Sequence, residues 1–206
     1  MVMDVHNVAA FENAFRCSVD LLEAAPLLAD KVVEQAGGEP VSIVSPDFGG
    51  AKRAQRIQEL VAVRLGAPVD FAVLEKRRDN GEVSGDLIIG PVTGRHAVVV
   101  DDLISAGTTI LRAVQACRAA GALSVTAFAT HGVFAPGAER LLGPDGPDRL
   151  YVTDTLLPTR LAPPPGSAAK LVVLPASGLF AEALRRIGAG ESVVALREME
   201  CRPPAR

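Results

Sequence analysis

The sequence lacks the paired cysteines that are typical of a disulfide framework or a zinc site. Its three cysteines, Cys17, Cys117 and Cys201, are odd in number and far apart, and none forms a C-x-x-C pair. We therefore expect buried or idle thiols in a reducing cytoplasm, with no part in metal binding or redox chemistry.

Also missing are a long apolar run and a large net charge. No apolar run approaches the ~20 residues that span a bilayer. The first residues also lack the charged segment followed by an apolar segment that is typical of a signal peptide. Because 21 basic residues stand against 24 acidic ones, the net charge of −3 offers no broad cationic field for nucleic acid or an anionic membrane. These absences predict a soluble, cytoplasmic protein whose partners are small molecules and other subunits.

Apolar residues make up 49% of the 206 residues, enough to bury a sizeable core. Short β-rich runs alternate with helical patterns, which is typical of an α/β fold with a parallel sheet covered by helices on both faces. No repeat or linker divides the chain, so we expect a single domain over residues 1–206. Strands are predicted over Val2–His6, Val41–Ser45, Val69–Leu74, Asp86–Ile89, His96–Asp101, Ser124–Thr130, Leu150–Thr153 and Leu171–Leu174. Helices, each closed by a nearby glycine, are predicted over Pro26–Gln35, Lys52–Leu65, Thr109–Ala120 and Gly178–Ile187.

Two stretches interrupt this alternation. Lys76–Gly85 is charged and polar, which predicts a mobile loop, and Pro158–Gly166 contains three successive prolines that cannot join a strand ladder. We expect the second stretch to be a surface connection.

The segment from Val98 to Thr109 carries the strongest functional signal. Residues 97–100 do not alternate in polarity, so both faces of this strand should be buried, as in the centre of a parallel sheet. Asp101 and Asp102 then fall at its carboxyl end, where ligands of open α/β sheets gather.

The loop from Ser105 to Thr109 suits a phosphate monoester. Its small residues let backbone N–H groups point into one concavity, the following helix adds its positive end, and hydroxyls donate further hydrogen bonds. The adjacent carboxylates suit sugar hydroxyls or Mg²⁺. The competing interpretation is a helix start capped by Ser105 or Thr108, but capping alone does not require two acids beside it.

Six blocks, in order along nearly the whole chain, resemble the ribose-phosphate diphosphokinase (PRPP synthetase) family, and the loop resembles the PRPP motif of type I phosphoribosyltransferases. The blocks are Asp4-Val5-His6, Ser45 to Gly50, Glu75 to Arg78, Asp101 to Thr109, Ala129 to His131 and Ser177 to Ala183. The resemblance implies a type I phosphoribosyltransferase-like fold. It also implies transfer of the diphosphoryl group of MgATP to the 1-hydroxyl of ribose 5-phosphate, which gives PRPP and AMP, in a homo-oligomer.

The resemblance also implies roles for individual residues. Lys76 and Arg78 match the catalytic cations of a flexible loop that closes over the transferring group, although composition alone favours a solvated surface. His6 and Asp47 match ligands of the Mg²⁺ that accompanies ATP, whereas the residues alone nominate only Asp47, since magnesium prefers oxygen ligands. Ribose 5-phosphate binding is implied for Arg78, Asp101, Asp102, Ser105, Ala106, Gly107, Thr108 and Thr109.

The sequence also departs from the family pattern. Many members have aspartate where Ser105 stands and threonine where Ala106 stands, which alters two side-chain contacts but keeps the backbone donors. The resemblance begins near the middle of a typical synthetase, so the chain corresponds to the C-terminal catalytic half, with residues 1–40 as the junction from an adenine-binding half. His131 matches the family, but no role for it follows from the residues, and we expect a structural one.

Two alternative functions are open. The phosphate loop would serve equally in a phosphoribosyltransferase that consumes PRPP, although such an enzyme should have a hood for a nucleobase, which we do not find. The chain could also be a non-catalytic, synthetase-like regulatory or assembly subunit. The pair Lys76 and Arg78, together with His6 and Asp47, favours the diphosphokinase.

Overall fold

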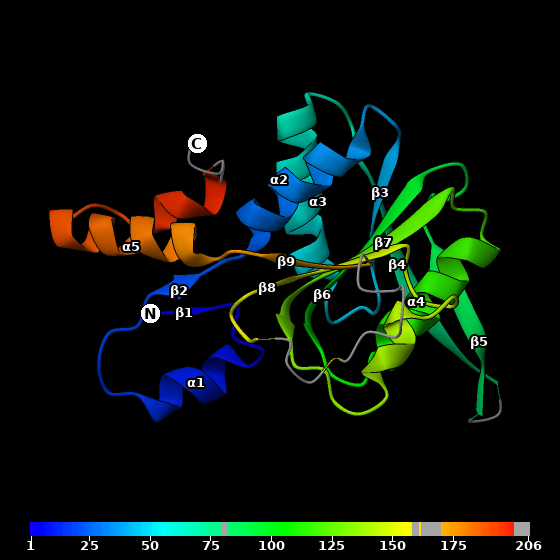
Figure 1. Cartoon of the computed structure of the whole chain (residues 1–206), viewed down its shortest axis with the longest axis horizontal. Helices are drawn as coiled ribbons and strands as arrows, with labels where there is room; N and C mark the ends of the chain where they lie inside the picture. Colours follow the sequence, from blue (N-terminus) through cyan, green and yellow to red (C-terminus); the bar gives the residue numbers. More distant parts are fainter. Residues whose placement is uncertain (80–81, 158–160, 162–169, 200–206) are drawn as a thin grey trace.

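The computed structural model describes residues 1–79, 82–157, 161 and 170–199, and for residues 76–79 and 82–85 it describes the backbone alone. Within this part of the chain, a sheet of seven strands has the order β5-β4-β3-β6-β7-β8-β9 (Figure 1). Neighbouring strands are parallel except for β4 and β5, which form an antiparallel hairpin at one edge. The strands are β3 (Val41–Ser45), β4 (Asp70–Asp79), β5 (Glu82–Ile89), β6 (His96–Ile104), β7 (Ser124–Gly132), β8 (Arg149–Thr153) and β9 (Leu171–Leu174).

Helices cover both faces of the sheet, as the alternating pattern predicts. On one face, α2 (Ala25–Ala36) and α3 (Ala51–Leu65) join a core that also receives α5 (Ser177–Ala189) and η3 (Val194–Glu198) (Figure 1). On the other, α4 (Thr108–Ala119) and η1 (Ala138–Leu142) enclose a second core. None of the described helices is long and apolar enough to cross a membrane.

Strand β6 lies at the centre of the sheet, between β3 and β7. Residues 97–100 are at most 4% exposed, because α2 and α3 pack on one side of the strand and α4 on the other. The predicted central strand is therefore confirmed. It continues to Ile104, three residues beyond the predicted end at Asp101, so both Asp101 and Asp102 lie within the strand.

The predicted loop over Lys76–Gly85 is wrong for the described backbone. β4 continues to Asp79 and β5 begins at Glu82, with antiparallel pairing from Val73 opposite Ile89 out to Asp79 opposite Glu82. Charged residues are compatible with such pairing because an edge hairpin faces solvent. The predicted connection over Pro158–Gly166 falls almost entirely outside the described residues.

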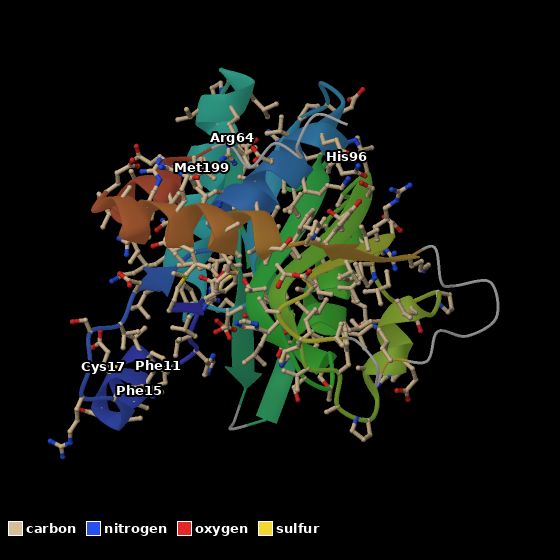
Figure 2. All side chains as sticks on the ribbon, turned by 60° about the vertical axis from the view of Figure 1, so that its left-hand side comes forward. Phe11, Phe15, Cys17, Arg64, His96 and Met199 are labelled. Atoms are coloured by element: carbon tan, nitrogen blue, oxygen red, sulfur yellow. The ribbon has the colours of Figure 1, made fainter. Side chains whose placement is uncertain are left out.

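The first predicted strand, Val2–His6, is wrong beyond Met3. β1 (Val2–Met3) ends because Asp4 adopts φ 41°, and it pairs in parallel with β2 (Leu21–Leu22) in a separate two-stranded sheet. Between these strands lies α1 (Val8–Ala14), which the sequence did not predict. Figure 2 shows its segment, with Phe11, Phe15 and Cys17, standing apart from the main sheet.

Arg64 ties the C-terminal segment to the helices above the sheet. Its side chain is only 7% exposed, and Nε lies 3.1 Å from the Asp30 carboxylate. Nη1 donates to the Pro26 carbonyl and Nη2 to the Met199 carbonyl, both at 2.8 Å (Figure 2). A buried guanidinium requires partners for its donors, and these contacts join α3 to α2 and to the end of η3.

Candidate active site

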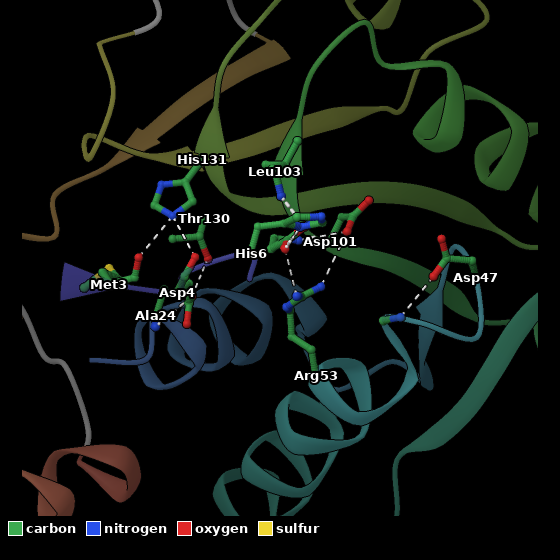
Figure 3. A network of polar contacts seen from close by, with 12 residues as sticks. Met3, Asp4, His6, Ala24, Asp47, Arg53, Asp101, Leu103, Thr130 and His131 are labelled. Carbon is green, nitrogen blue, oxygen red and sulfur yellow. Dashed lines mark hydrogen bonds and ion pairs between the residues drawn. The ribbon is translucent and has the colours of Figure 1, made fainter. Parts of the chain in front are cut away.

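A pocket of about 360 Å³ opens at the carboxyl ends of β3 and β6. It is lined by His6, Asp47, the acids Asp101 and Asp102, and residues 103–110. The fold therefore brings together the predicted phosphate loop, the predicted ribose-binding acids and both predicted magnesium ligands, from three separate parts of the chain (Figure 3).

The phosphate loop is held by backbone contacts from the segment after β7. The Ile104 carbonyl accepts hydrogen bonds from the N–H groups of Val133 and Phe134, both at 3.0 Å, and the Ser105 carbonyl accepts one from Ala135 at 3.2 Å. Gly107 completes the turn at φ 78°, and a Cβ atom there would lie 2.7 Å from Cδ1 of the buried Leu141. Both the backbone angle and the available space therefore require glycine.

The start of α4 has no side-chain cap. Its N-cap residue is Gly107, so the interpretation that Ser105 or Thr108 serves as the N-cap is wrong. The first N–H groups of the helix have no intrahelical partner, and Ser105, Ala106 and Thr108 are exposed around them. Unpaired donors and the positive helix end together favour an anion at this position.

Arg53 bridges the two acids at the end of β6. Nη2 lies 3.0 Å from Oδ2 of Asp102 and Nη1 lies 3.5 Å from Oδ1 of Asp101. Figure 3 shows the guanidinium reaching from α3 toward Asp101. Asp102 also contacts His6, with 2.6 Å between Nδ1 and Oδ2, and its side chain is only 5% exposed.

The two acids differ electrostatically. Burial raises the pKa of Asp101 to about 6, and the neighbouring Asp102 carboxylate adds to the increase. Burial works in the same direction at Asp102, but the hydrogen bond from His6 and the charge of Arg53 outweigh it and lower the pKa of Asp102. Asp102 is therefore the structural anion of the pair, and Asp101 is the acid open to a ligand.

Asp47 and His6, the predicted magnesium ligands, each keep one side-chain atom available for a metal. Oδ1 of Asp47 accepts the Gly50 N–H at 3.0 Å, and no described hydrogen bond reaches Oδ2. His6 is engaged through Nδ1, which leaves Nε2 without a described partner, and a carboxylate behind one ring nitrogen is typical of metal-binding histidines. Among the described residues no group of three His, Cys, Asp or Glu side chains could hold a metal. Two protein ligands suit Mg²⁺, which retains waters and substrate phosphates.

His131 has the structural role that was expected for it. Its Nε2 lies 3.2 Å from the Met3 carbonyl and 3.1 Å from the Asp4 carbonyl, and Nδ1 lies 2.8 Å from the Thr155 hydroxyl. The neighbouring Thr130 hydroxyl donates to the Asp4 carboxylate at 2.5 Å. The end of β7 thus holds the turn at Asp4, two residues before His6 (Figure 3). Local sequence patterns do not predict this network, because its partners are far apart in the chain.

Arg53 was also missed, although a signal was present. Lys52 and Arg53 stand in the first turn of α3, where the helix dipole favours anions over cations. Basic residues at such a position indicate an anion nearby. The backbone of Lys76 and Arg78 lies in β4, and their side chains lie outside the described residues, so their approach to the pocket stays a prediction.

Comparison with known proteins adds to this geometry. Residues 78–197 match the family described as phosphoribosyl synthetase-associated domain. The chain is 36% identical over 197 residues to ribose-phosphate pyrophosphokinases of Pasteurella multocida and Granulibacter bethesdensis, covering 95% of this chain and 60% of each of those proteins. The crystal structure of phosphoribosylpyrophosphate synthetase from Mycobacterium smegmatis superposes with a TM-score of 0.71 and 29% identity, over 91% of this chain and 58% of that one.

The chain thus spans about 60% of the length of these curated relatives. Its α/β, phosphoribosyltransferase-like fold, expected from the sequence, is confirmed by the sheet and by the solved synthetase. Since the family match covers more than half of the chain, the protein belongs to the phosphoribosyl synthetase-associated domain family.

Proposed function

We propose that this chain forms the ribose-5-phosphate-binding, catalytic half of a ribose-phosphate diphosphokinase. The reaction transfers the diphosphoryl group of MgATP to the 1-hydroxyl of ribose 5-phosphate and releases AMP. The observation that carries the proposal is the single pocket that contains the uncapped start of α4, the acids of β6 and the pair His6 and Asp47. The relatives' names agree with this function.

In this proposal the phosphate loop binds the 5-phosphate. Backbone N–H groups of residues 105–109 and the hydroxyls of Thr108 and Thr109 supply donors, and the backbone contacts from residues 133–135 hold them in place before substrate arrives. Donors that are fixed in advance do not lose conformational freedom on binding. The loop therefore anchors one end of the substrate and directs the sugar toward Asp101.

Asp101 is proposed to accept hydrogen bonds from the ribose hydroxyls, with Asp102 and Arg53 holding it in position. Asp47 and Nε2 of His6 would hold Mg²⁺, which when bound neutralises charge on the phosphates of ATP. Lys76 and Arg78 are proposed to stabilise the charge that develops on the transferring group. Catalysis would rest on alignment and charge stabilisation, as is general for phosphoryl transfer.

The finer assignments are proposals of the same kind. We propose MgATP and ribose 5-phosphate as substrates, a homo-oligomeric assembly and a cytoplasmic location. We also propose that residues 1–206 act as one domain, in which residues 1–40 form the junction toward an adenine-binding half.

Calorimetric titration with ribose 5-phosphate and Mg²⁺ tests the site directly. Asp101→Ala and Thr109→Ala should each weaken binding by ~1 to 3 kcal/mol, because each removes a hydrogen-bond partner of a charged, polar ligand. Asp145→Ala is the matched control, since it removes an exposed carboxylate before the amino end of β8, at the opposite edge of the sheet. Unchanged affinity in both folded site variants would remove the loop from the substrate site.

Release of AMP from ATP tests the reaction. Because relatives have about 40% of their length outside the matched region, the 206-residue chain alone should bind ribose 5-phosphate and PRPP but produce little AMP. Fusion to the N-terminal half of a relative should restore turnover, and Lys76→Ala or Arg78→Ala should then lower kcat far more than ribose 5-phosphate affinity. Release of diphosphate from PRPP with a nucleobase, without AMP formation from ATP, would instead establish a phosphoribosyltransferase.

A further inference from the structure

The β4–β5 hairpin has little support from the rest of the sheet. β3 pairs with β4 only as far as Ser45 opposite Val73, whereas β4 and β5 continue to pair out to Asp79 opposite Glu82. From Leu74 outward, the strand that carries Lys76 and Arg78 is therefore paired on one side only. A two-stranded ribbon without a third neighbour is marginally stable in water, so its position depends on side-chain contacts at its base.

Arg112, on helix α4, supplies such a contact. Its Nε donates to Oδ2 of Asp86 at 2.9 Å, and its Nη2 makes a second contact with Oδ1 of the same carboxylate. The side chains are 28% and 18% exposed. Ile88, two residues further along β5, packs against the core around α4. Among the described side chains, the Arg112–Asp86 pair is the outermost polar contact between the hairpin and another element.

Both ends of this ion pair lie beside proposed functional residues. Asp86 is the cross-strand partner of Lys76 in the hairpin. Arg112 is one helical turn after Thr108, on the same face of α4, and Thr108 belongs to the phosphate loop. A planar guanidinium that binds both oxygens of one carboxylate fixes orientation as well as distance. The pair therefore connects β5, the strand that pairs with the β4 segment of Lys76 and Arg78, to the helix that begins at the phosphate loop.

We propose that Arg112 and Asp86 are positioning residues that set the distance between the phosphate loop and the catalytic cations. The inference rests on the proposed function and adds to it the requirement that the two anion-binding elements keep a fixed separation. PRPP carries phosphate groups at both ends of its ribose, so a site that binds both ends needs two anion-binding elements at a fixed separation. Ribose 5-phosphate has only the 5-phosphate, so of the two anion-binding elements it needs only the loop.

Paired titrations of the 206-residue chain with PRPP and with ribose 5-phosphate, both with Mg²⁺, test this role. Arg112→Ala and Asp86→Ala should each lower PRPP affinity roughly tenfold, as expected when about one charge-assisted contact is lost, while ribose 5-phosphate affinity stays within about twofold. Arg112→Lys should be intermediate because lysine keeps the charge but cannot bind both oxygens. The double variant Asp86→Arg/Arg112→Asp should recover PRPP affinity.

Arg118→Ala is the matched control, because Arg118 lies on the same helix and pairs with Asp148 at 2.9 Å. It should change neither affinity. If Arg112→Ala weakens both ligands equally, or weakens neither, the positioning role is overturned while the proposed function stands. If the unsubstituted chain binds neither ligand, the proposed function fails first. Circular dichroism on each variant establishes that it is folded, and failure of the charge-reversed pair to recover affinity also counts against the inference.

Discussion

Substitution of Gly107 by alanine should damage both the fold and the phosphate loop. Gly107 has φ 78°, a region that costs a non-glycine residue about 1 to 2 kcal/mol. A Cβ atom there would also meet Cδ1 of Leu141 at 2.7 Å and Cγ at 2.8 Å. Leu141 is fully buried, so it cannot move aside without displacing its neighbours, and overpacking of this kind costs about 1 to 3 kcal/mol.

The two costs can be separated with a second glycine. Gly94 has φ 67° but no atom within 4 Å of a built Cβ. Gly94→Ala should therefore cost only the backbone strain, about 1 to 2 kcal/mol, whereas Gly107→Ala should cost about 2 to 5 kcal/mol. Urea titrations of the free energy of unfolding measure the difference directly.

The same pair separates stability from function. Gly107→Ala should also weaken ribose 5-phosphate binding in titration calorimetry, because relief of the contact with Leu141 displaces the loop, whereas Gly94→Ala should leave affinity unchanged. Equal losses of stability for the two variants would refute the packing argument. Unchanged affinity in folded Gly107→Ala would refute the assignment of the loop to the substrate site.

Three further predictions concern single side chains. Arg53→Ala should lower the free energy of unfolding by about 1 to 3 kcal/mol, because it leaves the buried Asp102 carboxylate without its cation. Addition of Asp102→Asn should recover part of this loss of stability, and no recovery would contradict the proposed cause. Ala106→Thr should tighten ribose 5-phosphate binding by about 0.5 to 1.5 kcal/mol, measured by calorimetry, because the exposed position gains a donor beside the phosphate. Alkylation at pH 8 followed by peptide mapping should label the exposed Cys17 but not Cys117, since burial raises the pKa of the Cys117 thiol to about 12; rapid labelling of Cys117 in the folded chain would contradict its burial.

Local patterns predicted the central part of the fold well. The run Ala97–Val100 is apolar on both faces, which only a strand with helices above and below it satisfies, and the phosphate loop followed from its small residues next to that strand. Helix ends were predicted closely where a glycine adopts a left-handed conformation, as Gly37 and Gly66 do after α2 and α3. These features are determined by residues that are close together in the chain, so local sequence patterns are enough to predict them.

The errors arose where distant residues decide the structure. Residues 76–85 were expected to form a loop because their composition is polar, but residues 76–79 belong to β4 and residues 82–85 to β5, and the two strands pair with each other. Their polarity concealed both strand segments. Val2–His6 was expected to be one strand, but a network from Thr130 and His131 holds Asp4 at positive φ and ends β1 after Met3. Such long-range contacts leave no periodic pattern in the sequence.

Charge balance explains why the pocket needs cations from several sources. Asp47, Asp101 and Asp102 line it, and Arg53 is the cation that contacts two of these carboxylates. A phosphate ester adds about two negative charges at pH 7, and the start of α4 contributes only about half a positive charge. The described side chains alone would therefore leave the bound substrate in a net negative site. A divalent cation at Asp47 and His6, and the cations of the hairpin, would supply the missing positive charge. The proposed metal site, the phosphate loop and the hairpin would then form one electrostatic arrangement, in which the separation between the three parts would matter as much as the identity of each residue.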